Sequence, residues 1–99
     1  MNVSYRASAL DDVEGIYQWV ARHSTRVAAE VEAAILTAAE WLGTHPELGT
    51  RTDERDVRRW PMPEYRYTIF YLIERDDDRI DIVRVMDGRR VRNVRRVPR

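Results

Sequence analysis

The chain has 99 residues, a formal net charge of zero and no cysteine. Without cysteine it can form no disulfide, thiolate metal site or cysteine nucleophile. It contains no apolar stretch long enough for a transmembrane helix and no signal-peptide pattern. We therefore expect one domain over residues 1–99, a cytoplasmic location and no contact with a membrane.

Charge is distributed unevenly along the chain. Residues 1–50 contain three arginines and seven acids, whereas residues 51–99 contain fourteen arginines and ten acids. Every cation is an arginine, which keeps its proton in a protein and so cannot act as a general base. The C-terminus is therefore strongly basic, but the neutral total argues against a general nucleic-acid binder.

The first third of the chain predicts a short strand and a helix. Residues 2–6 alternate weakly between apolar and polar side chains, which is typical of a strand. Ser8 and Asp11 have the spacing of a capping box, and acids would follow in the first helical turn. Apolar residues then recur at helical spacing, which predicts a helix over about residues 9–22.

A second helix should follow directly. Ser24 can cap its start, and a stripe of apolar residues runs from Val27 to Leu42. Gly43 and Pro46 are expected to end this helix. Because about three residues separate the two helices, we expect an antiparallel helical hairpin.

The second half predicts three strands. Residues 44–56 are polar and rich in turn-forming residues, so they are expected to form a loop. Strands are predicted at 57–60, 67–73 and 80–86, with the acidic segment 75–78 as a hairpin loop. The last strand is apolar on both faces at Ile82 and Val83, which indicates a central position. The fold class is thus α+β: an N-terminal strand, a helical hairpin and a three-stranded antiparallel segment that completes a small sheet.

Four segments resemble the RelE/ParE toxin superfamily of bacterial type II toxin–antitoxin systems. They are ALDDVEGIY (9–17) with WVA (19–21), THPELG (44–49), YRYTIFY (65–71) and IVRVMDGRR (82–90). The second is similar to the P-x-x-G stretch of the family, the third to its YRylIfY and the fourth to its IlrVlhGaRd. Together the four segments cover nearly the whole chain, and their order and spacing are those of the superfamily. The ParE-like branch is favoured.

The resemblance implies one of two activities. ParE-like members inhibit DNA gyrase, and RelE-like members cleave mRNA on the ribosome. Both are neutralised by a ParD- or RelB-like antitoxin in a hetero-oligomer. A third alternative is a non-toxic member that binds only its antitoxin. The gyrase inhibitor, a binding protein rather than an enzyme, is the function favoured here, with no cofactor and no metal.

The residues at the nuclease positions support this choice. By resemblance, Arg66 and Arg90 match the two family arginines, Arg59 lies near one lysine position, and Val57 occupies the other. RNA cleavage also needs a base and an acid to transfer protons. The segment after Gly88, RRVRNVRRVPR, offers no Tyr, His, Lys or Glu. Phosphate binding is well provided for, and proton transfer is not.

Binding residues are assigned by the same analogy. Gyrase would contact the basic C-terminal segment, through Arg89, Arg90, Arg92, Arg95 and Arg96. The antitoxin would contact Trp19, Trp60, Tyr65, Arg66 and Arg84. Structural alternatives stay open for two of these residues. Arg66 could pair with Glu64 or Asp87, and Arg84 with Asp81 or with an antitoxin acid.

Gly88 and the two histidines are expected to have structural roles. Gly88 would be needed for a positive φ angle or a close backbone approach at the end of the last strand. His23 and His45 are expected to be surface or capping residues, because they lie at the helix turn and in the loop after the second helix. The sequence therefore leaves no strong candidate for a catalytic base.

Overall fold

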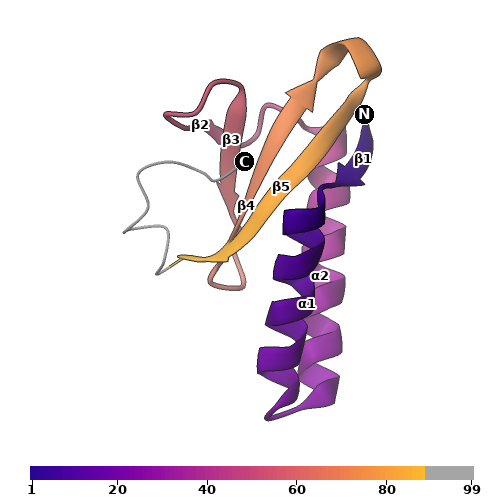
Figure 1. The fold of residues 1–99 in the computed structure, drawn as a ribbon, viewed down its shortest axis with the longest axis vertical. Coiled ribbons are helices and arrows are strands. Elements are labelled where there is room, and N and C mark those ends of the chain that lie inside the picture. The colour runs from indigo at the N-terminus through magenta and orange to yellow at the C-terminus, as the bar shows by residue number, and fades with distance from the viewer. Residues whose placement is uncertain (89–99) are drawn as a thin grey trace.

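The computed structural model describes residues 1–88 of the chain. Two helices and five strands follow one another from the N-terminus (Figure 1). In order they are β1 (Asn2–Tyr5), α1 (Ala7–Ala21), α2 (Thr25–Thr44), β2 (Thr50–Arg51), β3 (Val57–Pro61), β4 (Tyr67–Glu74) and β5 (Arg79–Asp87), with the 3₁₀ turn η1 (Arg75–Asp77) between β4 and β5.

The strands form one mixed sheet in the order β1-β5-β4-β3-β2. β1 is parallel to β5, and all other pairs are antiparallel. The predicted α+β class, the helical hairpin and the antiparallel β3–β4–β5 segment are confirmed. The prediction of an unbroken loop over 44–56 was wrong, because β2 lies inside it. Two exposed residues are too few to show the alternation that identifies a strand.

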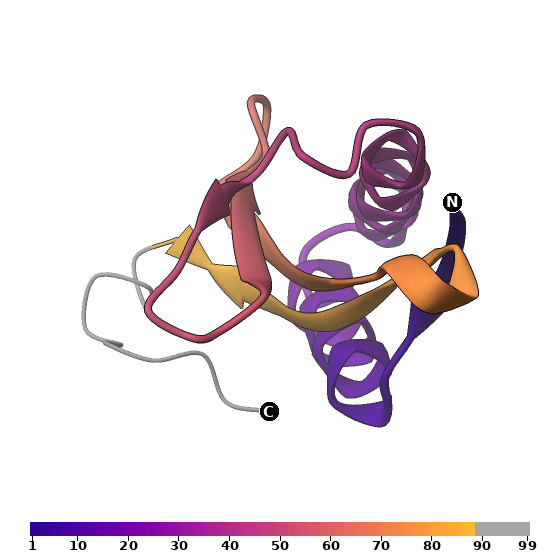
Figure 2. The same cartoon turned by 90° about the horizontal axis from the view of Figure 1, so that it is seen from above.

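Both helices lie against one face of the sheet (Figure 2). The main core forms between them and β4 and β5, with Ile35, Leu42, Ile69, Tyr71 and Ile82 fully buried. Val57, Phe70 and Val83, all from strands of the sheet, form a second and smaller buried apolar cluster. β4 and β5 therefore contribute apolar residues to two clusters, which explains their nearly continuous hydrophobic sequences.

A β-bulge in β5 places two consecutive residues in different clusters. Tyr71 pairs with Ile82 and Phe70 with Arg84, so Val83 is the extra residue. Ile82 packs in the helix-side core, and Val83 packs with Phe70. Both are completely buried, as the apolar pair in the sequence predicted.

The start of α1 differs from the prediction. The helix begins at Ala7, and Arg6 occupies the N-cap position without a side-chain hydrogen bond. Ser8 therefore lies inside the helix, and its hydroxyl donates to the Val83 carbonyl at 2.7 Å. The capping-box prediction at Ser8 and Asp11 was wrong, because Ser8 satisfies a strand carbonyl instead of the helix start, and no acid lies in the first turn.

The second helix begins as expected but ends differently. The Ser24 hydroxyl accepts a hydrogen bond from the Val27 N–H, so the predicted cap is confirmed. α2 continues through Gly43 to Thr44, so Gly43 does not end it. A Cβ atom at Gly43 would lie 2.8 Å from the Met1 carbonyl and 2.8 Å from a Val3 methyl. The glycine is required for the close approach of β1 to the helix.

Within residues 1–88, neither helix is both long and apolar enough to cross a membrane.

Candidate functional site

Side chains of α1 complete the edge of β5 where β1 stops. β1 pairs with β5 only as far as Tyr5, which lies opposite Ile82. Beyond this point Ser8 donates to the Val83 carbonyl. Asp12 accepts a hydrogen bond from the Val85 N–H at 2.9 Å. The helix therefore satisfies strand groups that would otherwise form an open edge.

Asp12 also binds Arg84. Its Oδ2 accepts from Arg84 Nε at 2.7 Å, and its Oδ1 accepts from Nη2 at 3.1 Å. The hydrogen bonds that Arg84 donates to this carboxylate raise the pKa of its guanidinium. The predicted internal ion pair of Arg84 is thus confirmed, but the prediction that its partner is Asp81 was wrong. Asp81 is instead bound by Ser4, Arg6 and Arg79.

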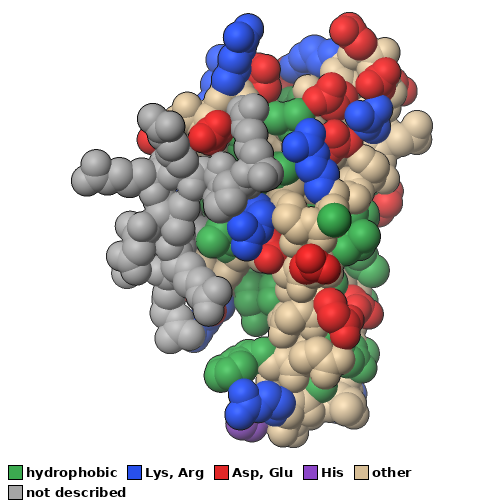
Figure 3. Space-filling view, in the orientation of Figure 1, with side chains coloured by type: hydrophobic (Ala, Val, Ile, Leu, Met, Phe, Trp, Pro, Cys, Tyr) green, Lys and Arg blue, Asp and Glu red, His purple; other side chains and the backbone are tan. Residues whose placement is uncertain are grey.

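A groove of about 580 Å³ follows this ion pair along α1 and the C-terminal half of β5. We call it the α1–β5 groove, and its lining includes Asp11, Asp12, Gly15, Ile16, Trp19, Tyr67, Arg84, Val85, Met86 and Asp87. Figure 3 views the molecule from the side on which α1 lies in front, where hydrophobic side chains are exposed among charged ones. A lining that mixes apolar and charged residues is typical of a surface that binds another polypeptide.

Trp19 is the most exposed large apolar residue of the described chain. Its side chain is 61% exposed, and the Arg22 guanidinium lies 4.8 Å above its ring. Gly15 lies one turn before it, and a Cβ atom there would meet nothing within 4 Å. Together these two residues make this part of the groove open and accessible.

The structure separates the residues that were predicted to bind an antitoxin. Trp19 and Arg84 line the α1–β5 groove. Trp60 and Tyr65 are partly buried against the helix-side core, so both contribute to folding. Arg66 is exposed in the segment before β4. Only two of the five residues therefore share the groove.

Gly88 follows β5 and contacts the segment before β4. Its N–H donates to the Arg66 carbonyl at 2.5 Å, and a Cβ atom would lie 2.9 Å from that oxygen. No described glycine has a positive φ angle. Of the two expected reasons for this glycine, close backbone approach is confirmed and positive φ was wrong.

Of the predicted nuclease residues, Arg59 and Arg66 lie in the described part of the chain, and neither can exchange a proton at neutral pH. Arg59 is exposed on β3 opposite Phe70, and Arg90 lies outside the described residues. His23 is in the turn between the helices, and His45 stacks on Trp41 with ring centroids 4.1 Å apart. Among residues 1–88 no group of three acids or histidines could hold a metal ion.

The predicted gyrase contacts also lie beyond the described part of the chain. They are Arg89, Arg90, Arg92, Arg95 and Arg96. The structure therefore does not test them, and they stay predictions.

The structural roles of two residues, Tyr71 and Asp12, were not predicted from the sequence. Tyr71 donates its hydroxyl hydrogen to the Pro46 carbonyl at 2.6 Å and accepts from the Gly49 N–H at 2.9 Å. These bonds give a structural reason for the PELG segment, which wraps around a buried hydroxyl. Asp12 was the second. Its only sequence signal was an acid at a helix position that neighbours the apolar stripe at Val13 and Ile16.

The fold is similar to solved toxins. A chain of the chromosomal ParDE system from P. aeruginosa is 17% identical, with a TM-score of 0.75 over 88% of this chain and 95% of that one. A chain of the intact E. coli RelBE complex is 9% identical, with a TM-score of 0.57 over 85% and 92%. The isolated E. coli RelE toxin is 10% identical, with a TM-score of 0.57 over 88% and 83%. No curated protein sequence matches significantly.

The helical hairpin and the five-stranded mixed sheet are thus the fold shared by these toxin–antitoxin structures. Residues 3–92 also match the model of the ParE toxin of the type II toxin–antitoxin system parDE. The chain belongs to the ParE toxin family.

Proposed function

We propose that this protein is a ParE-type toxin that inhibits DNA gyrase in the cytoplasm and is neutralised by its own antitoxin. The observation that carries the proposal is the match of residues 3–92 to the ParE toxin model. The P. aeruginosa relative described as a ParDE system supports the same assignment. In this proposal the chain acts by binding and is not an enzyme.

The residue types at the nuclease positions support gyrase inhibition over RNA cleavage. At the nuclease positions, Arg59 and Arg66 can bind phosphate but cannot accept a proton at neutral pH. Val57 is buried and has no ionisable group. The His45 Nδ1 atom lies 3.4 Å from the Trp41 carbonyl, at the C-terminal end of α2. A ribosome-dependent nuclease needs both phosphate binding and proton transfer.

The α1–β5 groove is the proposed antitoxin site. Its lining includes the apolar residues Ile16 and Val85, and Trp19 offers a large exposed ring. Aromatic residues in such positions often provide much of the binding energy of an interface. Asp11 and Asp87 lie at the groove as well, so the bound antitoxin segment should present apolar residues and at least one cation.

A gyrase assay tests the proposed function directly. Purified protein is added to gyrase and relaxed plasmid with ATP, and supercoiling and cleaved DNA are followed on gels. We expect inhibited supercoiling and accumulated cleaved plasmid, both reversed by the antitoxin. A translating ribosome extract with a defined mRNA is the comparison. If the mRNA is cut and gyrase is unaffected, the RelE-like alternative is correct; if neither changes, the non-toxic alternative is.

A further inference from the structure

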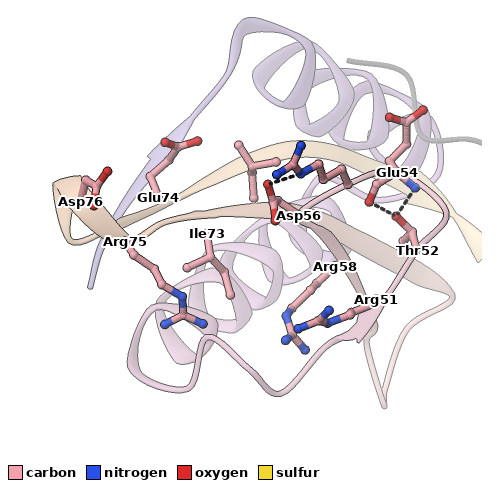
Figure 4. Close-up of a pocket in the computed structure, with 11 residues that line it drawn as sticks. Arg51, Thr52, Glu54, Asp56, Arg58, Ile73, Glu74, Arg75 and Asp76 are labelled. Atoms are coloured by element: carbon pink, nitrogen blue, oxygen red, sulfur yellow. Dashed lines mark hydrogen bonds and ion pairs between the residues drawn. The ribbon is translucent and has the colours of Figure 1, made fainter.

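Three arginines gather near the loop that follows α2, and none of them lines the α1–β5 groove. A hollow of about 560 Å³ lies between the β2–β3 connection and the end of β4. In Figure 4 the side chains of Arg51, Arg58 and Arg75 all extend to one side of this hollow. Arg51 and Arg58 are cross-strand partners on β2 and β3, and the fold adds Arg75 from η1. We call them the arginine cluster.

Only one carboxylate binds the arginine cluster in the described structure. Arg75 Nη2 donates to Glu47 Oε1 at 2.6 Å. Arg58 Nη1 donates to the carbonyls of Gly49 at 2.7 Å and Glu47 at 3.4 Å. Carbonyl oxygens fix the position of the Arg58 guanidinium but do not neutralise its charge. The cluster therefore holds an excess of positive charge.

Glu47 shows how this excess acts on an anion. Its pKa is lowered first by the hydrogen bond from Arg75, then by the charge of Arg75, and further by the charges of Arg58 and Arg51. All three guanidinium groups thus favour a negative charge at the position of this carboxylate. The Glu47 and Arg75 side chains are 64% and 60% exposed, so an incoming anion can reach them.

The surroundings favour a short acidic segment over a nucleic acid. The hollow is also lined by Glu54, Glu74 and Asp76, and by Arg55 and Asp56, which form an ion pair at 3.8 Å. In Figure 4 Glu74 and Asp76 point away from the three guanidinium groups. A nucleic-acid backbone, with a charge at every nucleotide, would pass close to these carboxylates and be repelled. A peptide can place its acids on the arginines alone and lay an apolar side chain on Ile73, which extends to the same side in Figure 4.

We propose that the arginine cluster is a docking site for an acidic peptide segment of a protein partner, which places a carboxylate beside Arg51, Arg58 and Arg75. Glu47 is an internal carboxylate that competes for the same guanidinium groups. The site lies apart from the α1–β5 groove and does not depend on which target the toxin has. It would give the chain a second contact surface, selective for acidic sequences.

The test measures fluorescence anisotropy of a labelled glutamate-rich peptide that contains leucine, with the purified full-length protein. We expect Arg51→Gln and Arg75→Gln each to weaken binding about two- to fivefold. Glu47→Gln should strengthen binding by a similar factor, because it removes the internal competitor. These opposite signs would not arise from a general loss of structure. Arg58 is left unchanged because its carbonyl contacts hold the 47–49 segment.

An exposed ion pair elsewhere provides matched controls. Arg26 Nη1 and Glu30 Oε1 lie 2.7 Å apart on α2, so Arg26→Gln and Glu30→Gln make the same chemical changes far from the cluster. Neither should alter peptide binding. A labelled DNA duplex is measured in parallel. If the duplex binds through the same arginines more tightly than the peptide, or if Arg51→Gln and Arg75→Gln have no effect, the proposal is wrong. Neither gyrase nor antitoxin is present, so this result is independent of the proposed toxicity.

Discussion

Asp12 binds both the guanidinium of Arg84 and the backbone of the next residue, Val85. The two bonds to Arg84 are 2.7 and 3.1 Å long, and the bond from the Val85 N–H is 2.9 Å. The Asp12 and Arg84 side chains are only 17% and 24% exposed. One carboxylate on α1 therefore fixes the helix against the part of β5 that β1 does not reach, and this contact forms one wall of the α1–β5 groove.

Replacing Asp12 by alanine should destabilise the fold. The change leaves the Arg84 charge and the Val85 N–H without their partner in a partly buried place, and we expect a loss of about 2–4 kcal/mol in the free energy of unfolding. Urea denaturation followed by circular dichroism measures it. Arg26→Ala, which breaks an exposed ion pair, should cost less than about 1 kcal/mol. Equal losses for both variants would show that the Asp12 contacts add no particular stability.

Two helical glycines should respond to alanine in opposite directions. A Cβ atom at Gly15 meets nothing within 4 Å, so Gly15→Ala should stabilise α1 by about 0.5–1 kcal/mol through helix propensity. At Gly43 it would meet Met1 and Val3 at 2.8 Å, so Gly43→Ala should destabilise the chain by about 1–3 kcal/mol. Urea midpoints of the two variants provide the measurement. A gain at Gly43 would mean that β1 moves away without cost.

Sequence patterns were sufficient for the helices and for all strands except β2, but not for the contacts between the elements. Helical spacing placed both helices, and alternation with turn residues placed β3, β4 and β5, because these signals depend on local burial. Ser8 was misassigned as a cap because a hydroxyl near a helix start can also bond a distant carbonyl. Asp12 and Arg84 lie 72 residues apart, and no local pattern joins them. The arginine cluster was missed for the same reason.

Tyr71→Phe should destabilise the loop that follows α2. The hydroxyl bonds Pro46 and Gly49, and its removal leaves the buried Gly49 N–H without an acceptor. We expect a loss of about 1–3 kcal/mol, measured by thermal unfolding. Tyr17→Phe is the control, since no described residue hydrogen-bonds its hydroxyl, and it should be nearly neutral. If the two variants have the same melting temperature, the stability of the loop does not depend on this hydroxyl.

Tyr71 should also make the fold sensitive to alkali. Burial raises the pKa of Tyr71 above its ordinary value of 10.0, an effect that outweighs the hydrogen bond with Gly49. Because the folded pKa is the higher one, this stability is complete below the unfolded value and is lost as pH rises through the folded value. Stability of the native chain should therefore decline in alkali, and Tyr71→Phe should decline less steeply in urea titrations. Parallel declines would contradict this assignment.

Asp81 should control part of the acid sensitivity. Burial alone would raise its pKa, but hydrogen bonds from Arg79 and Ser4 and the charges of Arg79 and Arg6 lower it below 3.8. This stability is thus present above the unfolded pKa and is lost as pH falls through the folded value. Asp81→Asn should be less stable than the native chain at pH 7, and the difference should shrink at about pH 3. An unchanged difference in urea midpoint at the two pH values would refute it.

Trp19→Ala should weaken antitoxin binding without weakening the fold. Its ring is 61% exposed beside the α1–β5 groove, so little core packing is lost, while an anchoring aromatic residue at an interface often contributes about 2 kcal/mol or more. We expect the dissociation constant for the antitoxin encoded beside this chain to rise about thirtyfold, by isothermal titration calorimetry. Trp41→Ala, which removes a ring that is 50% exposed on α2, is the matched control. If Trp41→Ala weakens binding as much as Trp19→Ala, or if Trp19→Ala has no effect, the antitoxin docks on another surface, because Trp19 lines this groove and Trp41 does not.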